Sequence, residues 1–195
     1  ELLKVKNLIK EADIVIANFK KGSAEKFGLD YNSLKEINPH LIYGNISGYG
    51  SKSSRAAYDV VLQAETGFMS INGEPNSKPL KMPVALIDVL AAHQLKEGIL
   101  VALLNKEKHN MGALVEVSLY DTAVSSLKNQ ATNWLMGNFI PQSIGSKHPN
   151  IAPYGETFLT KDNQHIVLAI GSNNHFEKLL DILGAKDIVS EKYKT

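Results

Sequence analysis

Short apolar segments alternate with amphipathic ones along most of the chain. Apolar residues recur at helical spacing from Leu2 to Ile9, and the apolar run 12–19 predicts a short buried strand that ends in a polar loop. A second buried strand is predicted over 41–46 and a third, with alternating apolar positions, over 114–119. Helices followed by buried strands are typical of a parallel sheet. The pattern therefore predicts an α/β fold.

Helical patterns fill the stretches between these strands. The further helices are predicted at 23–27, 31–37, 58–70, 88–106 and 120–136. Gly28 closes the first of them, and Asp30 is placed to cap the second. The helix over 88–106 has the longest pattern, so we expect it to cover a large part of the sheet.

The composition changes to Gly, Pro, Ser and Asn between residues 137 and 150, which predicts a linker. Beyond it, a hairpin is predicted around 161–164, and Ser172 or Asn173 caps a helix that runs to Leu183. We predict a large domain over 1–136, the linker 137–150, and an incomplete small α+β domain over 151–195. Because the sequence opens inside a helical pattern without Met, we expect a piece of a longer chain.

Composition narrows the classes of partner. A net charge of +1 gives no strong field for nucleic acid or an anionic membrane, so an anion site has to come from local clustering. The absence of cysteine excludes disulfides, thiolate metal sites and a cysteine nucleophile. The six histidines show no metal-ligand spacing, so no metal site is predicted. No apolar run reaches the roughly 18–20 residues that span a bilayer.

Asp88 is the one charge in the apolar run 84–92. Removing an ionised carboxylate from water costs several kcal/mol unless donors surround it. Asp is also a favoured N-cap, and a long helix starts here, so the position taken alone favours capping. A carboxylate at a helix N-terminus in an apolar site is also suited to covalent nucleophilic catalysis. The residues alone leave both interpretations open.

Two loops are candidates for an anion site. Lys20, Lys21 and Lys26 cluster after the first strand, at the strand end where α/β folds bind ligands, although ordinary surface lysines explain them at least as well. The Gly-rich bend 47–50 follows the second strand, but it matches neither GxGxxG nor a P-loop, so a plain turn is favoured.

Several segments together resemble family III CoA-transferases, a group that includes formyl-CoA transferase, carnitine CoA-transferase and alpha-methylacyl-CoA racemase. The resemblance lies in residues 12–19, 27–31, 37–43, 46–50, 57–64, Asp88, 98–104, 117–121 and 148–154, in order and with family-like spacing. It implies a Rossmann-like large domain whose N-terminal part is missing, and an enzyme that moves coenzyme A between an acyl-CoA and a free carboxylic acid. It also implies an interlocked homodimer without a metal, in the cytoplasm or, in a eukaryote, the mitochondrial matrix.

The resemblance also assigns roles to residues. The family's catalytic aspartate, which forms an acyl anhydride and then an aspartyl-CoA thioester, falls on Asp88. The family's CoA-contacting positions fall on Asn18, Phe19, Lys20, Lys26, Ala56, Ala57, Tyr58 and Asp59. By their chemistry, Lys20 and Lys26 suit phosphates and Phe19 suits the adenine ring.

The pair Tyr58-Asp59 separates two branches of the family. The racemase branch has a catalytic histidine where this chain has Tyr58, so transfer is favoured over racemisation or epimerisation. A non-catalytic CoA-binding fragment is the alternative from another class. The chain departs from the family pattern at 109–112, where Asn110 replaces a glycine of positive φ, and at Lys20-Lys21-Gly22, where Arg-Pro-Gly is commoner.

Overall fold

The computed structural model describes residues 1–186 and divides into two units. The first unit comprises residues 1–70 and 79–141, and the second comprises 71–78 with the residues from Gln142 on. Residues 187–195 of the predicted small domain lie outside the described residues. The elements of the first unit begin with α1 (Leu2–Ile9), β1 (Ile14–Ala17), α2 (Ser23–Phe27), α3 (Tyr31–Lys35) and β2 (Ile42–Ser47). They continue with α4 (Asp59–Glu65), α5 (Phe68–Ile71, whose last residue belongs to the second unit), α6 (Leu86–His109), β3 (Ala113–Ser118), α7 (Leu119–Ser126) and α8 (Asn129–Gly137).

The first unit is built on a parallel sheet in the order β1-β2-β3. Ile14 of β1 pairs with Ile42 of β2, which in turn pairs with Ala113 of β3. The three strands predicted from apolar runs are therefore present and parallel, which confirms the α/β prediction. Each begins or ends within a few residues of its predicted bounds.

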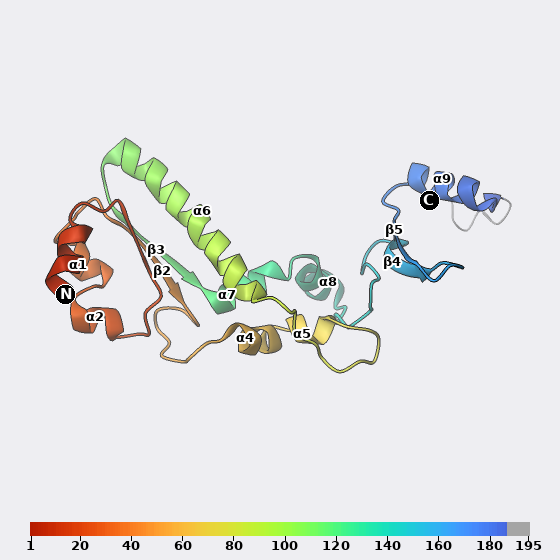
Figure 1. Cartoon of the computed structure of the whole chain (residues 1–195), viewed down its shortest axis with the longest axis horizontal. Coiled ribbons are helices and arrows are strands. Elements are labelled where there is room, and N and C mark those ends of the chain that lie inside the picture. Colours follow the sequence, from red (N-terminus) through yellow and green to blue (C-terminus); the bar gives the residue numbers. More distant parts are fainter. Residues whose placement is uncertain (187–195) are drawn as a thin grey trace. The chain divides into compact units, whose positions relative to one another are not determined.

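Helix α6 covers one face of this sheet, and in Figure 1 it runs alongside β2 and β3. Leu95, Ile99 and Ala102 of α6 form a buried cluster with Ile42 of β2. The neighbouring residue Tyr43 points to the opposite face, as the alternation of a strand requires. There it packs in a second buried cluster with residues that α1 and α3 supply.

Two glycines let α6 approach the sheet closely. A Cβ on Gly44 would lie 3.1 Å from the Cδ1 atom of Ile99, and a Cβ on Gly98 would lie 2.5 Å from Cγ1 of Val115. A β-branched valine has little rotamer freedom with which to withdraw. The close spacing between α6 and the strands therefore depends on the absence of a Cβ atom at these two glycines.

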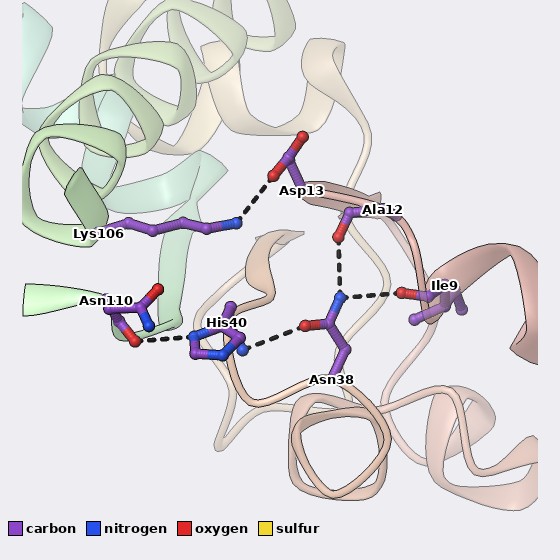
Figure 2. A network of polar contacts seen from close by, with 7 residues as sticks. All are labelled: Ile9, Ala12, Asp13, Asn38, His40, Lys106 and Asn110. Atoms are coloured by element: carbon purple, nitrogen blue, oxygen red, sulfur yellow. Dashed lines mark hydrogen bonds and ion pairs between the residues drawn. The ribbon is translucent and has the colours of Figure 1, made fainter.

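Side chain to backbone hydrogen bonds fix the amino ends of the strands, as Figure 2 shows. Asn38 is buried, and its Nδ2 donates to the carbonyl oxygens of Ile9 at 3.0 Å and Ala12 at 2.9 Å. Its Oδ1 accepts from the His40 backbone N–H at 3.1 Å. One amide side chain thus joins the end of α1 to the segment that leads into β2.

The same network reaches the end of α6 (Figure 2). His40 Nδ1 donates to the Asn110 carbonyl oxygen at 2.7 Å, and Lys106 Nζ lies 2.9 Å from Asp13 Oδ1. Asn110 ends α6 with φ of 53°, the left-handed conformation expected for a residue that replaces glycine. The turn between α6 and β3 is therefore kept despite the changed sequence.

Two predicted helices are each broken into a pair. The helix predicted over 58–70 is α4 followed by α5, because Gly67 between them has φ of 93°. The helix predicted over 120–136 is α7 followed by α8, with Lys128 at φ of 48° between them. A right-handed helix does not contain residues of positive φ. The prediction of one continuous helix was therefore wrong in both cases.

The second unit contains the hairpin β4 (Tyr154–Leu159) and β5 (His165–Ala169), which pair antiparallel as predicted. Helix α9 (Asn173–Leu183) follows, and the Ser172 side chain accepts from the His175 backbone N–H at 3.3 Å. The predicted cap on this helix is therefore confirmed. Over residues 1–186, no helix combines the length and the apolar character that crossing a membrane requires.

The close contact of α6 with β3 can be tested with Gly98→Ala. The new methyl gains about 1 kcal/mol of helix propensity but overpacks against Val115, which typically costs 1–3 kcal/mol. We expect a net loss of about 1 kcal/mol in the free energy of unfolding, measured by urea denaturation.

Val115→Ala supplies the control for this substitution, because it removes the opposing methyl groups. In the double variant Gly98→Ala/Val115→Ala, the alanine at 98 should no longer destabilise the protein relative to Val115→Ala alone. Equal losses from Gly98→Ala in both backgrounds would contradict the close contact.

Candidate active site

A cleft of about 850 Å³ lies in the first unit, where the loops after β1 and β2 meet the starts of α4 and α6. Parallel sheets commonly bind ligands outside the carboxyl ends of their strands. Of the nine residues predicted for the site, those that line the cleft are Asn18, Phe19, Lys20, Ala56, Ala57, Tyr58, Asp59 and Asp88. Lys26 lies on α2 and is not among the lining residues.

Asp88 lies in the first turn of α6 and is exposed to the cleft. Helix α6 begins at Leu86, two residues before Asp88, and its N-cap position is Ala85. Asp88 is therefore not the N-cap, although capping was the interpretation favoured by its position taken alone. Partial burial raises the pKa of the Asp88 carboxyl, and the negative charge of Asp59 raises it further.

Asp59 supplies the cap that the α6 terminus lacks in its own sequence. Its Oδ2 accepts a hydrogen bond from the Ile87 backbone N–H at 2.7 Å and a longer one from Asp88 N–H at 3.4 Å. Free N–H groups at a helix start favour such an anion. The carboxylate of α4 thus holds the turn that carries Asp88.

Gln63 fixes the orientation of the Asp59 carboxylate. The Gln63 side chain is fully buried, and its Nε2 donates to Asp59 Oδ1 at 2.5 Å and to the Val84 carbonyl at 3.3 Å. Its Oε1 accepts from Met82 N–H at 2.8 Å. Both oxygens of Asp59 therefore bond to the protein itself, which favours a positioning role over the CoA contact expected from the sequence.

The loops after β1 and β2 bring cationic groups to the cleft. Among the described lining residues, the cationic side chains are Lys20, Lys21 and Arg55. Lys21 Nζ donates to the Lys52 carbonyl oxygen at 2.6 Å, which joins the two loops. Phe19 precedes the two lysines and is about half exposed in the cleft.

Arg55 was not among the predicted site residues, although it is the only arginine in the sequence. Its guanidinium lies 4.4 Å from the centre of the Tyr49 ring and forms an ion pair with Glu65. Tyr49 Oη donates to Glu65 Oε2 at 2.7 Å. The Tyr49 hydroxyl, and then Arg55, lower the pKa of Glu65. The rarity of arginine in this chain was the one signal that could have identified the residue.

The Gly-rich bend 47–50 has a structural reason for its first glycine. A Cβ on Gly48 would lie 2.4 Å from Cβ of Ala57. The bend after β2 therefore packs directly against the segment that leads to Tyr58 and Asp59. This agrees with the turn interpretation and assigns the glycine to the shape of the cleft wall.

Side chains that could bind a metal are the next feature of the described residues. Within residues 1–186, no group of three or more His, Asp and Glu side chains is arranged to hold a metal ion.

The cap on α6 can be tested with Asp59→Ala. Loss of a helix-capping side chain typically costs about 1 kcal/mol, and Gln63 also loses a partner here. We expect the free energy of unfolding to fall by about 1–2 kcal/mol in urea denaturation.

Asp59→Asn is the matched control, since its side-chain oxygen can still accept from Ile87 N–H, whereas its amide nitrogen cannot accept from Gln63 Nε2. It should retain part of the stability that Asp59→Ala loses. If the two variants lose the same amount, the contribution of Asp59 is not the hydrogen bond to the helix start.

The sequence and the fold both match proteins of one family. Residues 4–195 match the model of CoA-transferase family III. Succinate–glutarate CoA-transferase of Agrobacterium fabrum is 38% identical over 98% of this chain and 48% of its own length. Human succinyl-CoA:glutarate CoA-transferase is 34% identical over 98% of this chain and 44% of its own length.

A solved structure agrees with these relatives. The crystal structure of a CAIB/BAIF family protein from Brucella suis aligns with a TM-score of 0.81 and 38% identity, over 100% of this chain and 52% of that one. The chain thus spans about half the length of the proteins it matches. With the family model matched from residue 4 to residue 195, the chain belongs to CoA-transferase family III.

Proposed function

We propose that this chain carries the catalytic aspartate and part of the CoA site of an acyl-CoA:carboxylate CoA-transferase. The observation that supports it best is Asp88, a carboxylate of raised pKa exposed in a cleft at the first turn of α6. A carboxylate in this position is accessible to a thioester. Family membership supports coenzyme A as the group transferred.

The transfer begins when an Asp88 oxygen attacks the thioester carbonyl of the donor. The C–S bond breaks, CoA leaves as the thiolate, and an acyl anhydride of Asp88 forms. The thiolate then attacks the Asp88 carbonyl of this anhydride, which releases the donor acid as a carboxylate and leaves an Asp88–CoA thioester. The acceptor carboxylate repeats these steps in reverse and leaves as its CoA ester, which regenerates Asp88. Covalent catalysis of this kind divides one difficult exchange into easier ones.

The cleft supplies the groups that this chemistry needs. The positive end of the α6 dipole favours negative charge that develops on the oxygens bonded to the Asp88 carbonyl. Lys20 from the cleft and Lys26 from α2 bind phosphates of coenzyme A, and Phe19 stacks on the adenine. Asn18, Ala56, Ala57 and Tyr58 contact the remainder of the cofactor.

The acids exchanged are dicarboxylic. The two relatives described above are named for succinate, succinyl-CoA and glutarate, which each carry two carboxyl groups or derive from such an acid. The present chain resembles them over nearly its whole length. We therefore extend this substrate class to it.

The protein as a whole is assigned the organisation of its family. Residues 1–136 form part of a Rossmann-like CoA-binding domain, 137–150 a linker, and 151–195 part of a small domain. The subunits form an interlocked homodimer in the cytoplasm or, in a eukaryote, the mitochondrial matrix. Acyl-CoA and free acid are the substrates, and the reaction uses no metal.

Racemisation is the competing activity within the family, and the cleft disfavours it. Among the described residues, none of those lining the cleft is a histidine, and Tyr58 is about two-thirds exposed there. A neutral phenol is a poor base at neutral pH, so proton abstraction beside the thioester lacks an evident partner.

Asp88→Asn and Asp88→Ala test the nucleophile directly. In the full-length protein, we expect either change to reduce CoA transfer from succinyl-CoA to glutarate by at least about 10³-fold, since the covalent route is removed. The wild-type protein incubated with succinyl-CoA and then with hydroxylamine or borohydride should carry a modification on Asp88, identified by mass spectrometry of its peptides.

Asp121→Asn is the matched control, because Asp121 also lies in the first turn of a helix but does not line the cleft. It should transfer CoA as the wild type does. An Asp88→Ala variant as fast as the parent would overturn the mechanism. CoA binding without any adduct or turnover would instead identify the non-catalytic alternative.

The acidic limb of the pH–rate profile is expected to depend on Asp59. The nucleophile is the deprotonated Asp88, so activity falls as the pH drops through its pKa, which partial burial and Asp59 hold above the ordinary value. Asp59→Asn removes a nearby negative charge and should move this limb to lower pH in kcat/KM measurements. A limb that stays in place would show that Asp59 does not influence the titration.

A further inference from the structure

We propose that Arg55 determines specificity by binding the distal carboxylate of the dicarboxylic acid while Asp88 reacts with its other end. This inference rests on the function proposed above and names the residue that selects the acid. Arg55 and Asp88 line the same cleft but belong to different elements. Arg55 lies on the loop after β2, whereas Asp88 lies on α6.

Helix α4 contacts both the turn that carries Asp88 and the side chain of Arg55. Asp59, the first residue of α4, bonds to the N–H groups of Ile87 and Asp88, whereas Glu65, the last, forms the ion pair with Arg55. Six residues of helix separate their backbones by about 9 Å. The residue that pairs with Arg55 and the residue that holds the turn of Asp88 therefore lie at opposite ends of α4.

The guanidinium is held in a fixed orientation with donors to spare. Tyr49 stacks beneath it at 4.4 Å, and Glu65 accepts from Nη2. A guanidinium has five N–H donors in a planar fork that fits a carboxylate. The Arg55 side chain remains 56% exposed, so its remaining donors can meet an acid in the cleft. A stacked and paired arginine loses less conformational entropy on binding than a free lysine.

Charge in the cleft also favours a cation in this role. Asp59, Asp88, Glu25, Asp30 and Glu116 all contribute carboxyl groups to the lining. A second carboxylate on the substrate would meet like charge over much of this surface. On the other loop, after β1, Lys20 is assigned to the phosphates of coenzyme A, and Lys21 donates to the Lys52 carbonyl oxygen. Of the cations that line the cleft, Arg55 is therefore the one left for the acid.

The experiment compares two acceptors of equal length, glutarate and pentanoate, in the full-length protein with succinyl-CoA as the common donor. The donor half-reaction is shared, so it cancels in the ratio of the two acceptors' kcat/KM values. We expect the wild type to prefer glutarate. Arg55→Gln should lower kcat/KM for glutarate by roughly 10- to 100-fold, the usual loss of a charge-assisted hydrogen bond, and leave pentanoate nearly unchanged.

Two further variants separate charge from geometry. Arg55→Lys keeps the charge but loses the fork, so it should retain part of the preference for glutarate. Lys52→Gln removes one positive charge from the same loop, and since Lys52 is not among the lining residues, the ratio should equal that of the wild type. Circular dichroism and thermal melting check that each variant is folded.

Four results would overturn the inference. If Arg55→Gln lowers kcat/KM equally for glutarate and pentanoate, Arg55 only supports the loop. If it raises KM for succinyl-CoA with the ratio unchanged, Arg55 binds coenzyme A. A wild type that uses pentanoate as well as glutarate does not select a distal carboxylate, although it remains a transferase. A wild type that transfers CoA to no acid refutes the proposed function itself, and the inference with it.

Discussion

The hydrogen bond from the start of α6 to the Asp59 carboxylate is the interaction on which the candidate site depends. It joins α4 to the longest helix of the described chain and fixes the turn that carries Asp88. The buried Gln63 holds the other oxygen of Asp59, so the bond has a defined direction. Because Asp59 is anchored on both sides, Asp88 stands on a fixed helical turn instead of a loop.

The amino and carboxyl ends of the parallel strands carry different kinds of residues. At the amino ends, Asn38, His40 and Lys106 satisfy backbone groups and pair with neighbouring elements, which closes that side of the unit. At the carboxyl ends, the chain forms loops with exposed cations and an aromatic side chain, and these line the cleft. Stability and binding are thus separated along the strand direction, as is usual for open α/β sheets.

Much of this fold could be predicted from the sequence, because the spacing of apolar residues and the capping residues indicate strands and helices over short segments. The break at Lys128 could not, since a positive φ at a lysine leaves no mark in a helical pattern. The break at Gly67 had a signal, because glycine adopts a positive φ readily, but the surrounding helical pattern outweighed it. Asp88 was identifiable as a charge within an apolar run. The cap from Asp59 and the pair of Arg55 with Glu65 were missed, because they join residues 28 and 10 positions apart. Contacts between residues far apart in the sequence become visible only when the positions of the elements are known.

Asp59 also couples stability to reactivity. Its carboxylate stabilises the start of α6, yet its charge adds to the effect of partial burial, and the two together raise the pKa of Asp88. For an acid, a raised pKa in the folded state means that ionisation weakens folding once the pH exceeds the unfolded-state pKa. The same shift makes the ionised Asp88 a more basic, and hence more nucleophilic, carboxylate. Asp59 therefore acts on both properties, because it stabilises the start of α6 and adds to the burial that raises the pKa of Asp88.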